Sequence, residues 1–317
     1  MNRKEAASAF APASIGNIGV GFDMLGVAIV GAGDRVDARR TDDAGISVAA
    51  VHGLDGEIHP ELSTVVEENT ASIAAAEFWN EHGDGGGVEL VVRKGVPLQS
   101  GMGSSAASAV AAVVAVNALL ATPLDVHDLL SFAIEGEKYA SKGLHADNVA
   151  PSLIGGMVFC PSTLLPRTVS LNTPEGVSSV LLHPEIQVNT AEARGGLARS
   201  YSMEKWVTQQ GYLGGFIAAC EHGDIELMAR SLKDVIIEPQ RSAAVPCFDA
   251  VKASATKNDA LGCSLSGSGP SIFALCRTAD ATKIAAGMEQ ACRNSGYDCQ
   301  SWISPLNAPG AQVEHAA

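Results

Sequence analysis

Apolar and polar positions along the chain repeat with two spacings, and each spacing predicts one kind of element. Residues 87–93 alternate between apolar and polar side chains, which is typical of a strand with one buried face. Residues 64–82 and 126–139 instead repeat with the spacing of a helix. The same patterns predict helices at 203–221, 225–235 and 278–296, and strands at 157–160, 180–183, 262–265, 271–276 and 300–303. Because strands and helices mix without a strict βαβ repeat, the order predicts an α+β protein.

Residues 106–121 are apolar enough to resemble a membrane span. The stretch is about 16 residues long, includes Ser108 and Asn117, and ends before Pro123, whereas a span needs about 20 residues. Its many alanines suit a helix that packs closely on all sides. We therefore expect a buried helix inside one lobe and no contact with a membrane.

Size and charge narrow the class of protein. At 317 residues with 46% hydrophobic side chains, the chain can build a substantial core, and we expect two lobes that share one site. Lysine and arginine number 21 against 35 acidic residues, which gives a net charge of −14. So negative a surface argues against nucleic acid or an anionic membrane as a partner. Any phosphate must then be bound locally, by backbone dipoles, a metal and a few placed cations.

Cysteine usage and the first residues favour the cytoplasm. None of the seven cysteines forms a C-x-x-C pair, and most lie in apolar runs, so we expect reduced, buried thiols. Residues 1–10 carry charges, but no apolar segment of the length that a signal peptide needs follows them. We therefore expect a cytoplasmic protein.

Residues 97–107, PLQSGMGSSAA, place a glycine loop directly before the apolar helix. Gly101 and Gly103 allow backbone conformations closed to other residues, and Ser104 and Ser105 suit a helix N-cap. The free N–H groups of the first helical turn, together with the helix dipole, can bind an anion without a basic side chain. The loop lacks the Walker ending and the context of a dinucleotide fingerprint, so those nucleotide folds are excluded. A plain helix cap is the alternative for this segment taken alone.

Two more glycine-rich segments accompany this loop. Residues 11–26, APASIGNIGVGFDMLG, gather glycines around Asn17 and close with Asp23, and residues 265–270 read LSGSGP. Three such turns in this order resemble the GHMP family of small-molecule kinases. Within that family, three further segments are similar to the branch that phosphorylates homoserine: HADNVAPSLIGG at 145–156, TAEAR at 190–194 and KDVIIEPQR at 233–241.

The resemblance implies a two-lobed GHMP kinase fold of the α+β class, with the site between the lobes. The N-terminal lobe would be of the ribosomal protein S5 domain 2-like type, and the C-terminal lobe would be ferredoxin-like. Residues 161–174 are rich in proline and small polar residues, which favours a boundary there. We therefore predict an ATP-binding lobe at residues 1–165 and a second lobe at residues 166–317.

The family also implies ATP and Mg²⁺ as cofactors. Mg²⁺ takes one or two protein oxygens besides water and phosphate oxygens, and by resemblance those belong to Ser105 and Glu137. Glu137 taken alone is more typical of a solvated helix acid. Asn69 and Lys94 lie where the family contacts adenosine, and each could instead be merely solvated. The implied ATP-binding set is Pro97, Gly101, Met102, Gly103, Ser104, Ser105, Ala106, Asn69 and Lys94.

An acceptor that is an amino acid needs an acid for its ammonium group and a guanidinium for its carboxylate. The resemblance gives Asp23 the first role, and Arg194 and Arg241 the second. Arg241 could instead brace Glu238 or Asp234. The implied substrate-binding set is Asn17, Asp23, His145, Asn148, Thr190, Arg194 and Arg241. The glycine turn at 266–269 would support this pocket without a chemical role.

No general base is evident for the acceptor hydroxyl. Where some sister kinases carry an aspartate, this chain has Asn148, and an amide cannot serve as a base at neutral pH. The family pattern does not assign that role to the adjacent Asp147. We expect Asn148 or Asn17 to act catalytically by orienting the hydroxyl. The hydroxyl then attacks a loose, metaphosphate-like centre and passes its proton to the phosphate.

The expected activity is ATP-dependent phosphorylation of the side-chain hydroxyl of L-homoserine to O-phospho-L-homoserine, a step in threonine biosynthesis. One alternative is a GHMP kinase for another small alcohol. The two arginines discriminate against it, because an isoprenoid or a sugar lacks an ammonium group beside a carboxylate. A second alternative is a non-catalytic sensor that retains the fold. The family further implies a homodimer.

Overall fold

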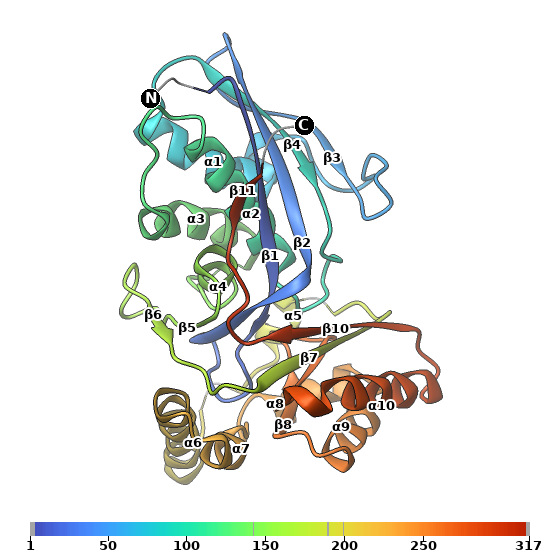
Figure 1. Ribbon diagram of the computed structural model, residues 1–317. Coiled ribbons are helices and arrows are strands. Elements are labelled where there is room, and N and C mark those ends of the chain that lie inside the picture. The colour runs from blue at the N-terminus through green and yellow to red at the C-terminus, as the bar shows by residue number, and fades with distance from the viewer. Residues whose placement is uncertain (1–3, 142, 189, 199, 315–317) are drawn as a thin grey trace.

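The computed structural model describes residues 4–141, 143–188, 190–198 and 200–314, and it arranges them around two β-sheets (Figure 1). Within those ranges the first sheet has seven strands, and its long members β1 (Ala6–Gly16) and β2 (Leu25–Thr41) are antiparallel. β4 (Gly87–Arg93) pairs with β2, and β3 (Gly45–His52) runs parallel to β4. The short strands are β5 (Met157–Phe159), β6 (Val169–Leu171) and β11 (Gln312–Glu314).

The second sheet is antiparallel throughout, with its strands in the order β10–β7–β9–β8. Counted along the chain from β7, this order is 4-1-3-2, and helices follow the first and third strands, as in a ferredoxin-like βαββαβ unit. The predicted fold of the C-terminal lobe is therefore confirmed. Its elements are β7 (Val177–Pro184), β8 (Gly262–Leu265), β9 (Ile272–Arg277), β10 (Cys299–Pro305), α9 (Phe248–Lys257) and α10 (Ala281–Asn294).

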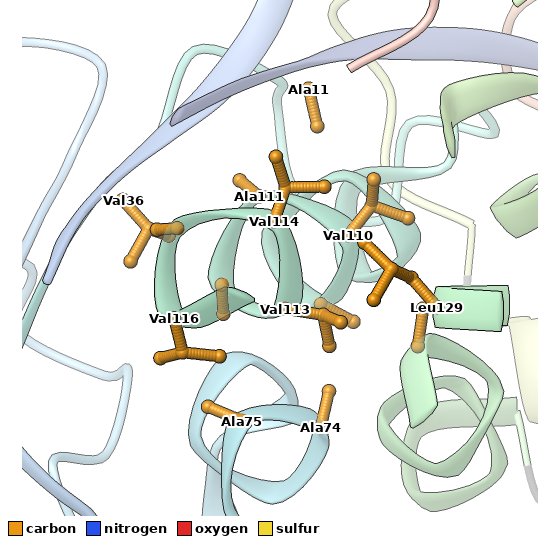
Figure 2. Close-up of a cluster of buried hydrophobic side chains, with 14 of the residues drawn as sticks. Ala11, Val36, Ala74, Ala75, Val110, Ala111, Val113, Val114, Val116 and Leu129 are labelled. Carbon is orange, nitrogen blue, oxygen red and sulfur yellow. The ribbon is translucent and has the colours of Figure 1, made fainter. Parts of the chain in front are cut away.

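Helix α2 (Ser104–Asn117) forms the centre of the first lobe, and all its residues except Ser105 are buried. Figure 2 shows its valine side chains between the sheet, represented by Val36, and helix α1 (Thr70–His82), represented by Ala74. Small side chains on both helices permit this close packing. The predicted buried helix is confirmed. Within the described ranges, no helix combines the length and the apolar character that crossing a membrane requires.

The helices predicted at 203–221 and 278–296 are present, the helix predicted from residue 64 begins at Thr70, and those at 149–154, 190–195, 238–241 and 248–257 were not predicted. The helix expected at 225–235 is α7 (Ile225–Ser231), and it ends early because Asp234 turns the chain by accepting the N–H groups of Ile236 and Ile237. The other helices are α3 (Leu130–Ser141), α4 (Val149–Ile154), α5 (Thr190–Gly195), α6 (Met203–His222) and α8 (Glu238–Arg241), with 3₁₀ turns η1 (Val66–Glu68), η2 (Val126–Leu129), η3 (Ser242–Ala244) and η4 (Thr278–Asp280).

The sequence patterns predicted no strand before residue 87, although β1, β2 and β3 all lie there. Five of the eleven residues of β1 are alanine, a residue that is depleted in strands. Most of β1 is buried on both of its faces, so its sequence does not alternate between apolar and polar residues. The strand was therefore hidden from an argument based on periodicity.

Strands from beyond residue 165 also join the first sheet. β6 pairs with β5, and β11, near the end of the chain, pairs with β1. The first sheet thus includes two strands from the second half of the sequence. The boundary at residue 165 stays a prediction.

The seven cysteines are all free thiols, and all except Cys299 are buried. Burial raises the pKa of Cys263 to about 12, which suppresses its thiolate form. The prediction of free, buried thiols is confirmed.

Candidate active site

The three glycine-rich turns meet at one place. Gly267 donates its N–H to the carbonyl of Gly16 at 3.1 Å, and the Asn17 side chain donates to the carbonyl of Gly267 at 2.8 Å. The Ser266 hydroxyl donates to the carbonyl of Gly101 at 2.6 Å. Residues of all three turns line a cavity of about 420 Å³. Segments that lie far apart in the sequence therefore share one site.

Close approach of these turns requires glycine at position 101. Gly101 has a φ of +74°, and a Cβ atom there would lie 2.5 Å from the carbonyl oxygen of Ser266. Both the backbone conformation and the space exclude a larger side chain. The glycine loop and the turn at 266–269 consequently pack against each other through their backbones.

Helix α2 begins without a side-chain cap. Its N-cap residue is Gly103, with a φ of +68°, so the prediction that Ser104 or Ser105 caps the helix is wrong. Both serines lie in the first turn, where their hydroxyls donate instead to the Val96 carbonyl at 3.0 Å and to Glu137 at 2.7 Å. The first N–H groups of α2 thus lie at the cavity wall, and no side chain in the described part of the protein accepts them as a cap. Together with the helix dipole, these groups can attract an anion.

Most of the predicted site residues line this cavity. Met102 and Ala106 do not, because both are fully buried in the core, and Pro97 lines a neighbouring hollow. Thr190 begins α5, and its side chain lies outside the described part of the chain. The predicted residues along the wall are Asn17, Asp23, Asn69, Lys94, Gly101, Gly103, Ser104, Ser105, Glu137, His145, Asn148, Arg194 and Arg241.

Lys94 is buried and ties the start of the loop to the sheet. Its ammonium group pairs with Asp34 of β2 and donates to the Ser104 carbonyl at 2.9 Å and the Ser108 hydroxyl at 2.8 Å. The second oxygen of Asp34 accepts the N–H of Gly95 at 2.8 Å. Sequence analysis missed Asp34, which is fully buried. The pair fixes the corner between β4 and the glycine loop, and the role of Lys94 toward adenosine stays a prediction.

Replacing Lys94 with methionine is expected to lower the free energy of unfolding by about 3 kcal/mol, because it leaves the Asp34 carboxylate buried without its partner. Unfolding in urea, followed by circular dichroism, measures the loss. The control is Lys138→Met, which removes the exposed pair with Glu135 and is expected to cost under about 0.5 kcal/mol. A loss no larger than the control, together with a raised KM for ATP, would contradict the anchoring role.

Asn69 caps helix α1. Its side-chain oxygen accepts the N–H groups of Ala71 at 3.0 Å and Ser72 at 3.4 Å, and its Nδ2 donates to the Ser63 carbonyl at 2.9 Å. These bonds satisfy the orphan donors of the first helical turn. Asn69 is therefore a structural cap at the cavity wall, and its contact with adenosine stays a prediction.

Asp23 and Arg194, which were predicted to bind opposite charges of the acceptor, bind each other. Arg194 donates two hydrogen bonds to the Asp23 carboxylate, at 2.9 and 2.7 Å. His145 lies beside them, with its Nδ1 3.3 Å from the same carboxylate. Burial lowers the pKa of His145 and outweighs the attraction of Asp23, so the ring is neutral at pH 7.

Arg241 lies deeper, and 4% of its surface is exposed. Its guanidinium donates to the Gly267 carbonyl at 3.1 Å. The two acids that it was alternatively expected to brace are used elsewhere. Glu238 pairs with Lys252, and Asp234 accepts N–H groups of the following turn. Arg241 thus faces the cavity beside the glycine turn.

The two asparagines have different surroundings. Asn17 has a φ of +68°, and its amide accepts the N–H of Asp23 at 3.0 Å and donates to Gly267, which fixes the turn that carries Asp23. The oxygen of Asn148 accepts the Ser14 hydroxyl at 3.0 Å. The Nδ2 group of Asn148 is therefore the part that can donate to a bound hydroxyl.

Two carboxyl groups in the wall have unusual protonation. Burial raises the pKa of Glu137 to about 7, although the hydrogen bond from Ser105 opposes this. Burial and the nearby charge of Asp23 raise the pKa of Asp147 to about 7, although the N–H of Asn17 donates to it at 3.1 Å. Burial therefore shifts both groups toward their protonated forms.

Known proteins resemble this chain over nearly its full length. The families described as "GHMP kinases N terminal domain" and "GHMP kinases C terminal" match residues 69–156 and 216–294. Homoserine kinase of Xylella fastidiosa (strain 9a5c) is 42% identical over 308 residues, which cover 97% of this chain and 94% of that protein. Homoserine kinase of Chlorobium phaeobacteroides (strain BS1) is 39% identical over 322 residues, covering 98% and 99%. The crystal structure of homoserine kinase from Cytophaga hutchinsonii superposes with a TM-score of 0.94 at 40% identity, over 99% of both chains.

Proposed function

Because the chain belongs to the homoserine kinases of the GHMP kinase family, we propose that its cavity transfers the γ-phosphoryl group of ATP to the side-chain hydroxyl of L-homoserine. The product is O-phospho-L-homoserine, for threonine biosynthesis. The observation that carries the proposal is the make-up of one cavity wall: a glycine loop and an uncapped helix start lie beside an acid and two arginines. The glycine loop and the helix start suit an anionic phosphate, and the acid with the two arginines suits a zwitterion.

The phosphate end aligns the donor. The backbone from Gly101 to Ala106 supplies N–H groups, and Pro97 and Met102 serve by shaping that backbone. Asn69 and Lys94 line the same pocket, and the family resemblance assigns the adenosine to their side. Since phosphoryl transfer leaves little covalent work for the protein, fixing the phosphates in line with the acceptor is its main contribution.

Ser105 and Glu137 would hold Mg²⁺. Their side-chain oxygens lie 2.7 Å apart at the wall, and oxygen donors are the ligands that Mg²⁺ prefers. Two protein oxygens are enough, because this ion keeps water and phosphate oxygens as further ligands. The raised pKa of Glu137 also fits a metal site. Burial disfavours the charge of this carboxylate, and a bound cation would favour its ionised form. When bound, the ion neutralises charge on the transferring phosphate.

Homoserine binds by exchanging partners with the Asp23–Arg194 pair. The ammonium group goes to Asp23, and the carboxylate goes to Arg194 and Arg241, whose planar forks can each bond two oxygens. Asn17 and His145 line this end of the pocket, and the family resemblance assigns Thr190 to the same end. An acceptor that carries both charges replaces both halves of the internal pair, whereas a sugar or an isoprenoid leaves a partly buried charge without a partner.

The hydroxyl proton passes to the phosphate without a protein base. Asn148 donates through Nδ2 to the attacking oxygen and so orients it, and Asn17 contributes by fixing the turn. Asp147 is 4% exposed, and its carboxylate accepts the N–H of Asn17. We assign it the bracing of that turn.

Asp147→Asn is expected to keep kcat near the wild-type value and to stabilise the protein at high pH. The pKa of Asp147 is raised from 3.8 to about 7, so the free energy of unfolding falls as the pH rises through that window, and above it the full cost of a buried charge is present. The neutral amide avoids this cost. Melting temperatures should therefore rise most at pH 8 and less at pH 5, where only part of this cost is present. A loss of kcat of about 10²–10⁴-fold, the usual contribution of a general base, would overturn the assignment.

The proposed activity is tested by ADP release from the purified protein with ATP and Mg²⁺. L-homoserine is compared with mevalonate, galactose, L-serine and no acceptor, and phosphorus NMR identifies each product. Homoserine-dependent turnover that yields a phosphate monoester is expected. Preferred turnover of another alcohol would instead support a GHMP kinase of different specificity, and turnover of none would support a non-catalytic role.

The family also suggests a location and an oligomeric state. We place the protein in the cytoplasm and expect it to be a homodimer, with homoserine and ATP as its small-molecule substrates. Sedimentation velocity on the full chain gives the oligomeric state directly. Fractionation of the source cells gives the location.

A further inference from the structure

The aromatic ring of Phe22 lies against both arginines of the acceptor pocket. The Cζ atom of Arg194 is 5.4 Å from the ring centroid, and that of Arg241 is 5.1 Å from it. Guanidinium groups are attracted to an aromatic face at such distances. One side chain thus contacts the two cations that are proposed to bind a single carboxylate.

Polar partners alone do not account for how these arginines are held. The Nε atoms of Arg194 and Arg241 are buried and have no hydrogen-bond partner among the residues that the structure describes. Two guanidinium groups so close also repel each other: burial lowers the pKa of Arg241, and the charge of Arg194 lowers it further. A neutral ring that attracts both cations offsets this repulsion.

The position of the ring is fixed by the turn that carries it. Asn17 accepts the N–H of Asp23 through its side chain and the N–H of Gly21, at 2.9 Å, through its carbonyl. Gly21 then accepts the N–H of Leu25 at 2.9 Å. Hydrogen bonds on both sides of Phe22 therefore hold its backbone, and its neighbour Asp23 presents the carboxylate to Arg194.

We propose that Phe22 is a positioning residue that holds Arg194 and Arg241 together at the carboxylate end of the acceptor pocket. This rests on the proposed function and deepens it, because it assigns part of the preference for an amino acid over other alcohols to an apolar side chain. Phe22 acts through the arginines and makes no bond to the reacting atoms. Its loss should weaken acceptor binding and leave ATP binding intact.

Phe22→Leu is expected to raise KM for homoserine about tenfold, because the two arginines lose the ring that faces them. The kcat value and KM for ATP should remain near wild type. Phe22→Tyr keeps the aromatic face and should restore KM. A general structural defect would lower kcat and affect both substrates, and tyrosine would not rescue it selectively. An unchanged KM for homoserine in Phe22→Leu would overturn the proposal.

Phe10→Leu is the matched control. Its ring also lies beside an arginine, Arg35, with the Cζ atom 5.0 Å from the centroid, but both belong to the first sheet away from the cavity. This variant should leave both KM values unchanged. Thermal melting confirms that each variant folds, and Phe22→Met replaces Phe22→Leu if the latter does not. If the wild-type protein fails to phosphorylate homoserine, the proposed function is refuted. If the wild type is active but substitution of Phe22 leaves KM for homoserine unchanged, this inference alone is refuted.

Discussion

Arg241→Met is expected to lower kcat/KM for homoserine about 1,000-fold, almost entirely through KM, while KM for ATP stays unchanged. Arg241 is 4% exposed, and its guanidinium lies at the cavity wall. Removing one partner of a buried, hydrogen-bonded charge pair typically costs about 2–5 kcal/mol, since the substrate carboxylate is left unpaired in the pocket. Steady-state kinetics with each substrate varied in turn measures the effect.

Two further variants separate the shape of the guanidinium from its charge. Arg241→Lys keeps the charge but loses the planar fork, so it should recover only part of the affinity. Arg39→Met removes an exposed arginine that pairs with Glu89 on the first sheet, and it should change neither KM value. If Arg241→Met altered KM for ATP and homoserine equally, the residue would be a general support of the cavity and not part of a carboxylate clamp.

Glu137→Gln is expected to lower kcat about 1,000-fold and to raise the Mg²⁺ concentration needed for half-maximal rate. The amide keeps the size of the side chain and can still accept the Ser105 hydroxyl, but it lacks the negative charge that holds a divalent cation. Loss of a preorganised electrostatic contribution to the transferring phosphate typically costs about 10²–10³-fold in kcat. Titration of Mg²⁺ at saturating ATP and homoserine provides the measurement.

The control for this substitution lies two residues away on the same helix. Glu135 is exposed and pairs with Lys138, so Glu135→Gln should leave kcat and the Mg²⁺ requirement unchanged. The comparison addresses directly whether Glu137 is merely a solvated helix acid. Equal behaviour of the two variants would remove Glu137 from the metal site.

Together the two substitutions divide the cavity into its halves. The effect of a substitution at Arg241 is expected on acceptor binding and should not depend on the Mg²⁺ concentration. The effect of a substitution at Glu137 is expected on the phosphate and should not depend on the charged groups of the acceptor. Substitutions without shared contacts are generally additive in free energy. The double variant should therefore show the product of the two effects on kcat/KM.

Much of the fold could be predicted from local patterns. The strand at 87–93, the helix at 203–221 and the hairpin strands at 262–265 and 271–276 are all present within a residue or two of their predicted ends. The apolar residues of these elements alternate or repeat clearly, because each element buries one face. β1 was not predicted, since it is rich in alanine and largely buried on both faces.

Within the site, the sequence predicted the local backbone conformation better than it predicted which side chains contact one another. Glycine at 101 and 103 signals positive φ angles, which the structure shows at +74° and +68°. The serine residues that follow suggested a cap, but packing directs their hydroxyls to Val96 and Glu137. A side chain's preference is local, whereas its actual partner depends on which atoms the fold brings near.

The sequence by itself determined the three glycine turns and the buried central helix, because backbone freedom and periodicity are properties of nearby residues. The acid and the arginines of the acceptor site were predicted from motifs that resemble the family. Tertiary structure decided that Asp34 holds Lys94, that Asp23 pairs with Arg194 from 171 residues away, and that Phe22 lies against two arginines. Such pairings arise from the packing of distant segments, and no local spacing encodes them.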